Sequence, residues 1–311
     1  MLSRVAANIY WFGRYMQRAE NTARLINVNA QLLMDLPPSV MFGWKPLVDI
    51  VGGTDEFTRL YDEYSDVNVM RFLMTDERYS GSILTSLTRA REILRTIRDA
   101  MPREVWERLN TLHYYVQERR EQAATRLGRQ EFLSRVIEGT LLVHGVLTAN
   151  MSRDVGFYFL RIGAQIEQAD MTTRILDVRS TSLIDAGGAR SEQLAPFYNI
   201  QWMSVLRSLT AYQMYRRHVK ARVNRTGVLR FLLQNREFPR SVTFCLTTIG
   251  STLPQLPQDR HVERSLWRAR ALVLDANIDK LVEQGLHELM DEIQIGLGAL
   301  HAAFQQAYFD T

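Results

Sequence analysis

The stretch "RYMQRAENTARLINV" (Arg14–Val28) places polar and apolar side chains at helical spacing. At about 100° per residue, Gln17, Glu20, Asn21 and Arg24 fall within one arc of a helix. This polar stripe mixes amides with charges and contains no lysine, a mixture that suits a packed polar interface. A solvated helix face is the alternative interpretation, because most polar stripes of amphipathic helices face water.

A second copy of the pattern lies in the other half of the chain, in "AQIEQADMTTRILDV" (164–178). Gly13–Val28 aligns with Gly163–Val178 without a gap, and both copies keep an acid four residues before an arginine. The second copy has Ala164 and Gln168 where the first has arginines. Whether the second copy retains a binding site is therefore left open.

Another pair of segments repeats in the same order. The segment "VMRFLMTDERYSGSILTSL" (69–87) aligns with "VLRFLLQNREFPRSVTFCL" (228–246). Likeness in a fixed order indicates an internal duplication. We therefore expect two tandem helical repeats, approximately 1–150 and 151–311, that face each other around a pseudo-two-fold axis, as the subunits of symmetric dimers do.

Helical periodicity dominates the whole chain, and no stretch alternates polar and apolar residues for long enough to predict a sheet. With 311 residues, of which 46% are hydrophobic, the chain can bury a large core. We predict an all-α multi-helix bundle in a single domain over residues 1–311, with Ser3 and Ser152 as helix N-caps. The expected helices span residues 3–34, 56–75, 80–100, 102–127, 129–150, 153–179, 200–221, 225–234, 238–253, 259–284 and 286–308.

Composition limits the class of protein. No run approaches the roughly eighteen apolar residues that span a bilayer, and no signal peptide is evident, so we expect a cytoplasmic protein without a membrane segment. The net charge of +4 is too small to favour nucleic-acid binding. Lysine occurs at three positions, so 35 of the 38 basic residues are arginine, which a GC-rich genome explains. The single cysteine, Cys245, lies in an apolar run and is expected to pack as a small hydrophobe.

Known motifs for metal, nucleotide or nucleophilic chemistry are missing from the sequence. It contains no HExxH, no P-loop and no GxSxG. We therefore expect no metal and no cofactor bound by the chain itself. Glu283, His287 and Asp291 share one helix face, but a surface stripe explains them better than a metal site. The basic segment "YRRHVKARVNRTGVLR" (215–230) is either a receptor for phosphate groups or an acidic peptide, or a solvated helix end.

The segments "LSRVAANIYWFGRYMQRAENTARLINV" (2–28), "RARE" (89–92) and "IEQADMTTRILDVR" (166–179) resemble the alpha-E domain family, a bacterial all-helical family named for an ER signature. The resemblance covers essentially the whole chain. It implies a helical protein that accompanies circularly permuted ATP-grasp ligases, and hence a part in peptide or amide-bond formation. ATP and Mg²⁺ would then be bound by the partner, and the substrate would be a peptide or amino-acid-like molecule.

The same resemblance assigns the candidate site. Glu20 and Arg24 are the expected catalytic pair, with Glu20 accepting a proton from an incoming amine. The arginines would clamp a carboxylate, acyl phosphate or peptide. The expected substrate-binding residues are Arg14, Arg18, Asn21, Arg91, Glu92, Glu167, Asp170 and Arg174.

Two functions are compatible with these residues. In the first, the chain binds or acts on the substrate in an Arg/Glu cleft. In the second, it is a non-catalytic helical scaffold or adaptor that recruits the ATP-grasp partner, and its charges only join the two halves. Burial distinguishes them, because a site needs charges that line an open cleft, whereas a scaffold pairs every charge inside a sealed interface.

Overall fold

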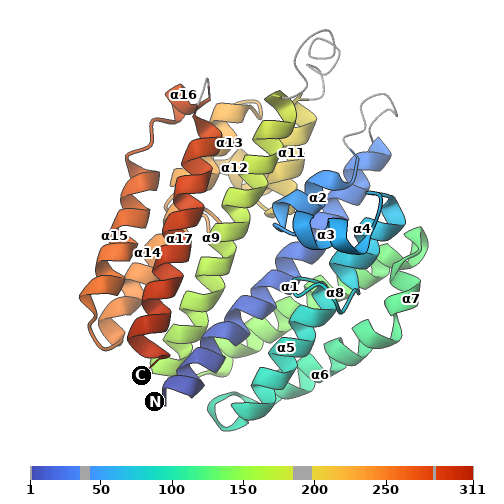
Figure 1. Ribbon diagram of the computed structural model, residues 1–311. Helices are drawn as coiled ribbons and strands as arrows, with labels where there is room; N and C mark the ends of the chain where they lie inside the picture. Colours follow the sequence, from blue (N-terminus) through green and yellow to red (C-terminus); the bar gives the residue numbers. More distant parts are fainter. Residues whose placement is uncertain (1, 36–42, 185–197, 283–284, 311) are drawn as a thin grey trace.

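A computed structural model describes residues 2–35, 43–184, 198–282 and 285–310 of the chain (Figure 1). These residues form an all-α bundle and include no β-strand, as the sequence predicts. In the first half, the helices are α1 (Ser3–Asp35), α2 (Lys45–Ile50), α3 (Thr54–Leu60), α4 (Asp66–Met74), α5 (Ile83–Thr96), η2 (Arg98–Ala100), α6 (Arg103–Glu118), α7 (Arg120–Ala123) and α8 (Arg126–Asn150).

The second half follows with a long helix and a set of shorter ones. Its helices are α9 (Val155–Ile184), α11 (Tyr198–Ser208), α12 (Tyr212–His218), α13 (Arg225–Gln234), α14 (Val242–Thr252), η4 (Leu253–Gln255), α15 (Arg260–Leu274), α16 (Ile278–Leu281) and α17 (Leu286–Tyr308).

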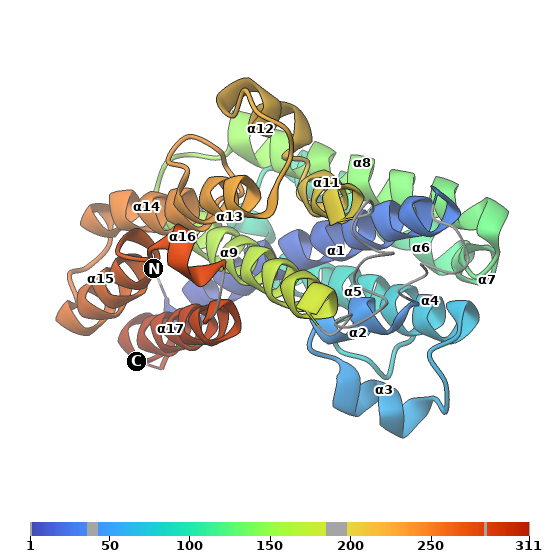
Figure 2. The ribbon, with the colours of Figure 1, turned by 90° about the horizontal axis from the view of Figure 1, so that it is seen from above.

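The two long helices α1 and α9 form the centre of the bundle and pack against each other. They run in the same general direction, starting from the end of the molecule where both termini lie (Figure 1). Around them, α1 packs on α5 and α8, whereas α9 packs on α14 and α17. Two shorter helices cross between the halves, because α2 packs on α9 and α11 packs on α1. The view in Figure 2 shows the two groups of helices on opposite sides of this central pair.

Two glycines allow the backbones of α1 and α9 to touch. A Cβ atom on Gly13 would overlap the carbonyl oxygen of Leu160, and one on Gly163 would overlap the carbonyl oxygen of Tyr10. Glycine is the residue that permits such close backbone approach. The two contacts are reciprocal, since the alignment of the halves pairs Gly13 with Gly163 and Tyr10 with Leu160.

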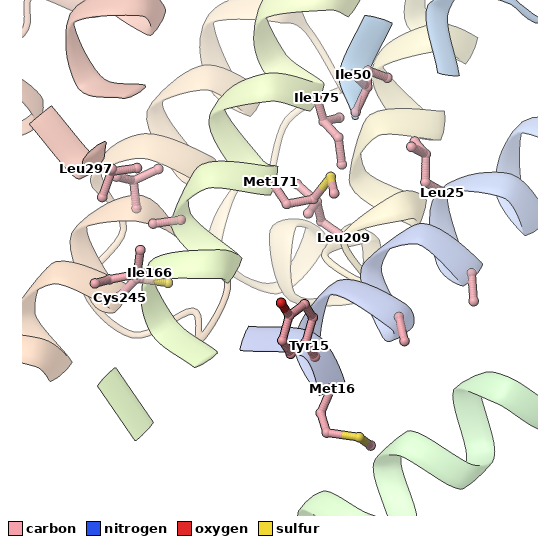
Figure 3. Close-up of a cluster of buried hydrophobic side chains, with 14 of the residues drawn as sticks. Tyr15, Met16, Leu25, Ile50, Ile166, Met171, Ile175, Leu209, Cys245 and Leu297 are labelled. Carbon is pink, nitrogen blue, oxygen red and sulfur yellow. The ribbon is translucent and has the colours of Figure 1, made fainter. Parts of the chain in front are cut away.

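The apolar core extends from this contact into both halves of the bundle. Figure 3 shows Leu25 of α1 and Met171 and Ile175 of α9 among its buried side chains. Cys245 is fully buried, and burial raises the pKa of its thiol to about 12, so it packs as a small hydrophobe. The core is therefore shared between the halves, in agreement with a single bundle.

Matching helices in the two halves also begin in the same way. Ser82 caps α5 by accepting a hydrogen bond from the Thr85 amide, and Ser241 caps α14 by accepting one from the Phe244 amide. The alignment pairs Ser82 with Ser241. Matched caps and reciprocal packing are what a duplication would produce, and the tandem repeat itself stays a prediction.

Several expected helices are interrupted. The segment 56–75 contains two helices, α3 and α4, separated by residues 61–65. The segment 200–221 breaks between α11 and α12, where Thr210 adopts a φ of 51°, a left-handed conformation that no α-helix continues. Ser152 does not cap α9, because that role falls to Asp154, whose carboxylate accepts from the Phe157 amide.

By length and composition alone, α8 is apolar enough to cross a membrane, although it contains no uninterrupted apolar run of that length. However, α8 packs on α1 and α6 through Phe132, Leu133 and Val136, which are buried. A core helix of a bundle passes the same test of length and composition. Only 33% of its apolar window is buried, so this packing accounts for part of the apolar character of α8.

The α1–α9 contact predicts that replacing glycine by alanine has opposite effects on stability inside and outside the contact. Gly13→Ala and Gly163→Ala should each destabilise the fold by about 1–3 kcal/mol, because the added methyl group has no space. Gly145→Ala is the matched control, since no atom lies within 4 Å of the new Cβ. It should stabilise the helix by about 0.5–1 kcal/mol. Urea denaturation measures both, and equal effects at Gly13 and Gly145 would contradict the close contact.

Candidate functional site

Arginines that flank the polar stripe of α1 form ion pairs with α9. Glu167 of α9 accepts hydrogen bonds from two arginines of α1. Arg14 Nε lies 2.8 Å from its Oε2, and Arg18 donates through Nε at 2.5 Å and through Nη2 at 3.0 Å. The Glu167 side chain is only 5% exposed, whereas Arg14 and Arg18 are 12% and 23% exposed. The two predicted substrate-binding arginines therefore clamp a carboxylate of the protein itself.

The protonation of Glu167 follows from this arrangement. Burial alone would raise the pKa of its carboxyl group, but Arg18 and Arg14 outweigh burial and lower the pKa to about 2. The same attraction raises the pKa of Arg14 above its usual range, against the opposing effect of burial. Glu167 is therefore ionised at neutral pH and paired with both arginines.

The predicted catalytic pair lies farther along α1. Glu20 Oε1 accepts from Arg24 Nε at 2.7 Å and from Arg240 Nη2 at 2.6 Å. Only 2% of the Glu20 side chain is exposed. Burial opposes ionisation, but Arg240 and Arg24 outweigh it and lower the pKa of Glu20. Arg240 belongs to the connection between α13 and α14, so this contact brings the second half onto α1.

Amide side chains connect the Glu20 cluster to α9, at residues next to Arg18 and Glu167. Gln17 Nε2 donates to Asn21 Oδ1 and to Gln168 Oε1, both at 3.0 Å. Arg240 Nη1 donates to the same two oxygens, at 3.1 Å and 2.8 Å. We call the whole set the central polar network, which comprises Arg14, Gln17, Arg18, Glu20, Asn21, Arg24, Glu167, Gln168 and Arg240.

The network is asymmetric in charge although its positions match. Gln17 aligns with Glu167, and Arg18 aligns with Gln168. Across the helix pair, Arg18 meets Glu167 as an ion pair, whereas Gln17 meets Gln168 through a neutral hydrogen bond. One of two equivalent contacts is therefore charged and the other is not. Gln168, which aligns with Arg18, therefore still contacts the opposite helix through its hydrogen bond with Gln17.

Asp170 and Arg174, the equivalents of Glu20 and Arg24, form a more exposed pair. Arg174 Nε lies 2.8 Å from Asp170 Oδ2, with side-chain exposures of 33% and 21%. A Cβ atom on Gly52, in the connection that follows α2, would lie 2.8 Å from Arg174 Nη1. This pair therefore lies beside the crossing of α2 over α9.

Arg91 and Glu92 contact other residues. Arg91 of α5 donates to Asn110 of α6 at 2.6 Å and lies over the ring of Trp106. It also pairs with Glu92 at 3.0 Å, and the Glu92 side chain is 47% exposed. These two residues join α5 to α6 rather than lining the network between α1 and α9.

Most members of the network are buried. Four well-formed surface hollows of the described chain lie between α15 and α17, beside α12, at η4, and where α5 connects to α6. None of these four is lined by a member of the network. Asn21 Nδ2 is a buried donor without a hydrogen-bond partner among the described residues.

A possible metal cluster lies elsewhere. Ligand atoms of Asp177, His287 and Asp291 come within 4.8 Å of one another. His287 Nδ1 lies 2.7 Å from Asp177 and its Nε2 lies 3.6 Å from Asp291, so the two carboxylates are at opposite edges of the ring. The hydrogen bond to Asp177 raises the pKa of His287, which favours a protonated ring between two acids. We assign this trio to an ion-pair link of α9 with α17; Glu283 lies outside the described residues.

Three members of the network were not among the site residues predicted from the sequence. Gln17 and Gln168 could have been found, because the alignment of the halves places each beside a charged candidate. Arg240 gave no such signal, since it precedes α14 and aligns with Gly81. Its role depends on how α14 packs on α9, which the local sequence does not reveal.

Comparison with known proteins identifies relatives over the whole chain. A family model described as a predicted alpha-helical domain with a conserved ER motif matches residues 1–309. Uncharacterized proteins of Mycobacterium bovis (strain ATCC BAA-935 / AF2122/97) and Mycobacterium tuberculosis (strain CDC 1551 / Oshkosh) are each 21% identical over 327 residues. The match covers 97% of this chain and 36% of each relative, so the chain spans about a third of their length. No solved structure matches it.

The Glu167 pair predicts both a loss of stability and a change in its pH dependence. Glu167→Gln should cost about 3–5 kcal/mol at pH 7, because it leaves two buried arginines without a carboxylate. In the wild type, Glu167 makes its full contribution to the free energy of unfolding above the pKa of about 4.3 that a glutamate has in the unfolded chain. This contribution should be lost as the pH falls towards the folded pKa of about 2.

Urea denaturation between neutral and acidic pH measures this effect. The variant should show a smaller loss of stability between about pH 4.5 and pH 2 than the wild type, by about 3 kcal/mol. Glu92→Gln, at a half-exposed carboxylate, is the control and should stay within about 0.5 kcal/mol of the wild type. If the free energy of unfolding fell equally with acid pH in the wild type and in Glu167→Gln, the pairing of an ionised Glu167 with Arg14 and Arg18 would be contradicted.

Proposed function

The chain belongs to the Alpha-E family, and from this premise we propose that it is a non-catalytic helical adaptor in an ATP-grasp-dependent system that forms peptide or amide bonds. The observation that carries the proposal is the state of the central polar network. Its two buried carboxylates are each bonded to two arginines. Charges in this state join helices and are not free to bind a substrate.

Glu20 is poorly suited to general-base catalysis in this environment. A general base works best when its pKa lies near the working pH. The pKa of Glu20 is instead lowered, because Arg240 and Arg24 outweigh the effect of its burial. Transfer of a proton to Glu20 would also break two charge-assisted hydrogen bonds, which are about twice as strong as neutral ones. The assignment of Glu20 and Arg24 as catalytic stays a prediction.

The arginines that would clamp a substrate are also occupied. Arg18 holds Glu167 through two donors and Arg14 holds it through one. A substrate carboxylate would have to displace Glu167, leaving a buried anion without its partners, and breaking such a pair costs about 3–5 kcal/mol. The unpartnered Asn21 Nδ2 is the observation that favours the second candidate, a small substrate-binding site inside the network.

An adaptor needs a partner, and the relatives support one. Because this chain spans only 36% of each mycobacterial relative, those proteins join a similar domain to a much longer chain. The family resemblance suggests a circularly permuted ATP-grasp protein as the partner of this chain. That partner would bind ATP and Mg²⁺ and would act on a peptide or amino-acid-like substrate. Because that partner would need ATP, we propose a cytoplasmic location for the assembly.

The groove between α15 and α17 is the face best suited to receive the partner. It has a volume of about 660 Å³ and is lined by Trp267, Ala271, Leu272, Leu289 and Ile295, among others. Trp267 is 69% exposed and Ile295 is 72% exposed. Exposed tryptophan beside aliphatic side chains is typical of protein interfaces, where a few such residues provide most of the binding energy.

The test is reconstitution with the ATP-grasp protein, ATP and candidate amines, with amide product and partner binding measured together. The double variant Trp267→Ala with Ile295→Ser should weaken partner binding at least about tenfold, because it removes the apolar anchors. Leu127→Ser is the matched control, since Leu127 is 93% exposed on α8, outside the groove. It should bind as the wild type does.

Glu20→Gln distinguishes an adaptor from a catalyst. For protein shown by circular dichroism to be folded, the adaptor predicts unchanged product formation per bound complex. Loss of a general base would reduce turnover by about a hundredfold or more. Such a loss with partner binding intact would overturn the adaptor in favour of the catalytic alternative. Equal partner binding by the groove variant and Leu127→Ser would exclude the α15–α17 face.

A further inference from the structure

Helix α12 lies at the periphery of the bundle (Figure 2). A basic hollow lies beside this helix. Its volume is about 730 Å³, and its cationic lining consists of Arg216, Lys220 and Arg222. Tyr212 and Asn199 add a hydroxyl and an amide to the lining. Ligand sites for small molecules have volumes of about 300–1,000 Å³, so the hollow can hold a molecule of that size.

No acidic residue lines this hollow in the described part of the chain. The central polar network pairs its arginines with carboxylates, and Arg230, farther along the same basic segment, is paired with Asp279 at 2.8 Å. Arg216, Lys220 and Arg222 have no such pair among the described residues, although they share one small surface. Like charges brought together repel one another, and a bound anion would remove that cost.

The helix dipole explains only part of this cluster. Arg216 lies in the last turn of α12, where a cation is favoured by the negative end of the helix. Lys220 and Arg222 lie beyond the last turn, where the effect of the dipole falls off. They precede α13 instead, which begins at Arg225 and has no acidic residue in its first turn. Because the N-terminal end of a helix is positive, it adds to the positive potential on this side.

We propose that the hollow formed by Arg216, Lys220 and Arg222 binds a small, multiply charged anion. Two arginine forks and one ammonium group can engage two or more phosphate or carboxylate groups, because a guanidinium binds either one in a bidentate manner. Tyr212 and Asn199 provide neutral hydrogen-bonding groups. Met203, which also lines the hollow, offers an apolar surface to the uncharged part of the ligand. This site is independent of the adaptor role and of the central polar network.

Isothermal titration calorimetry on the full chain tests the site with three probes: inorganic pyrophosphate, ADP and citrate. At about 0.1 M salt, where exposed charges are partly screened, at least one probe should bind with a stoichiometry near one. Arg216→Gln and Arg222→Gln should each reduce the affinity about tenfold, as expected when a charge-assisted hydrogen bond to an anion is lost. Preference for pyrophosphate and ADP over citrate would identify phosphate as the recognised group, and the reverse preference would identify carboxylates.

Arg217→Gln is the matched control. Arg217 is the next residue of α12, carries the same charge and is exposed, but it does not line the hollow. Its substitution should change the affinity by less than about twofold, since exposed charges outside a site contribute little. Absence of binding by all three probes would overturn the proposal. An equal loss in Arg217→Gln would also overturn it, because it would show a diffuse attraction to positive charge rather than a site.

Discussion

The rest of the structure depends on the direct contact of α1 with α9. Gly13 and Gly163 let the two backbones touch, and the polar side chains farther along both helices are buried between them. Those side chains must satisfy one another, because a buried charge without a partner is costly. Glu167 between Arg14 and Arg18, and Glu20 between Arg24 and Arg240, meet that requirement. The packing of backbone on backbone and the pairing of charges are thus two parts of one constraint.

The asymmetry of the network has a physical basis. A second Arg–Glu pair at the positions of Gln17 and Gln168 would add two more buried ions, each of which must lose its hydration. The neutral Gln17–Gln168 hydrogen bond joins the same positions without that cost. The second copy of the pattern therefore supplies one acid, Glu167, and one neutral partner, Gln168, to the network, and this difference from the first copy is compatible with packing alone.

Much of the fold could be predicted from the sequence, because apolar spacing in long helices such as α1 and α17 is a strong local signal. The breaks were harder to predict, since the left-handed turn at Thr210 carries no glycine to mark it. The stripe on α1 was visible from Gln17, Glu20 and Arg24, but its burial was not. Whether a polar stripe meets water or another helix depends on contacts between distant residues, and Arg240 shows this most clearly.

The central claim is that the charges between α1 and α9 join the helices. A double-mutant cycle of Arg18→Gln and Glu167→Gln tests it directly, because the double variant creates the same Gln–Gln combination that residues 17 and 168 already form. The account predicts that the two substitutions are coupled by at least about 1.5 kcal/mol in the free energy of unfolding, as for close buried charge pairs. Additive effects, with a coupling energy near zero, would contradict it.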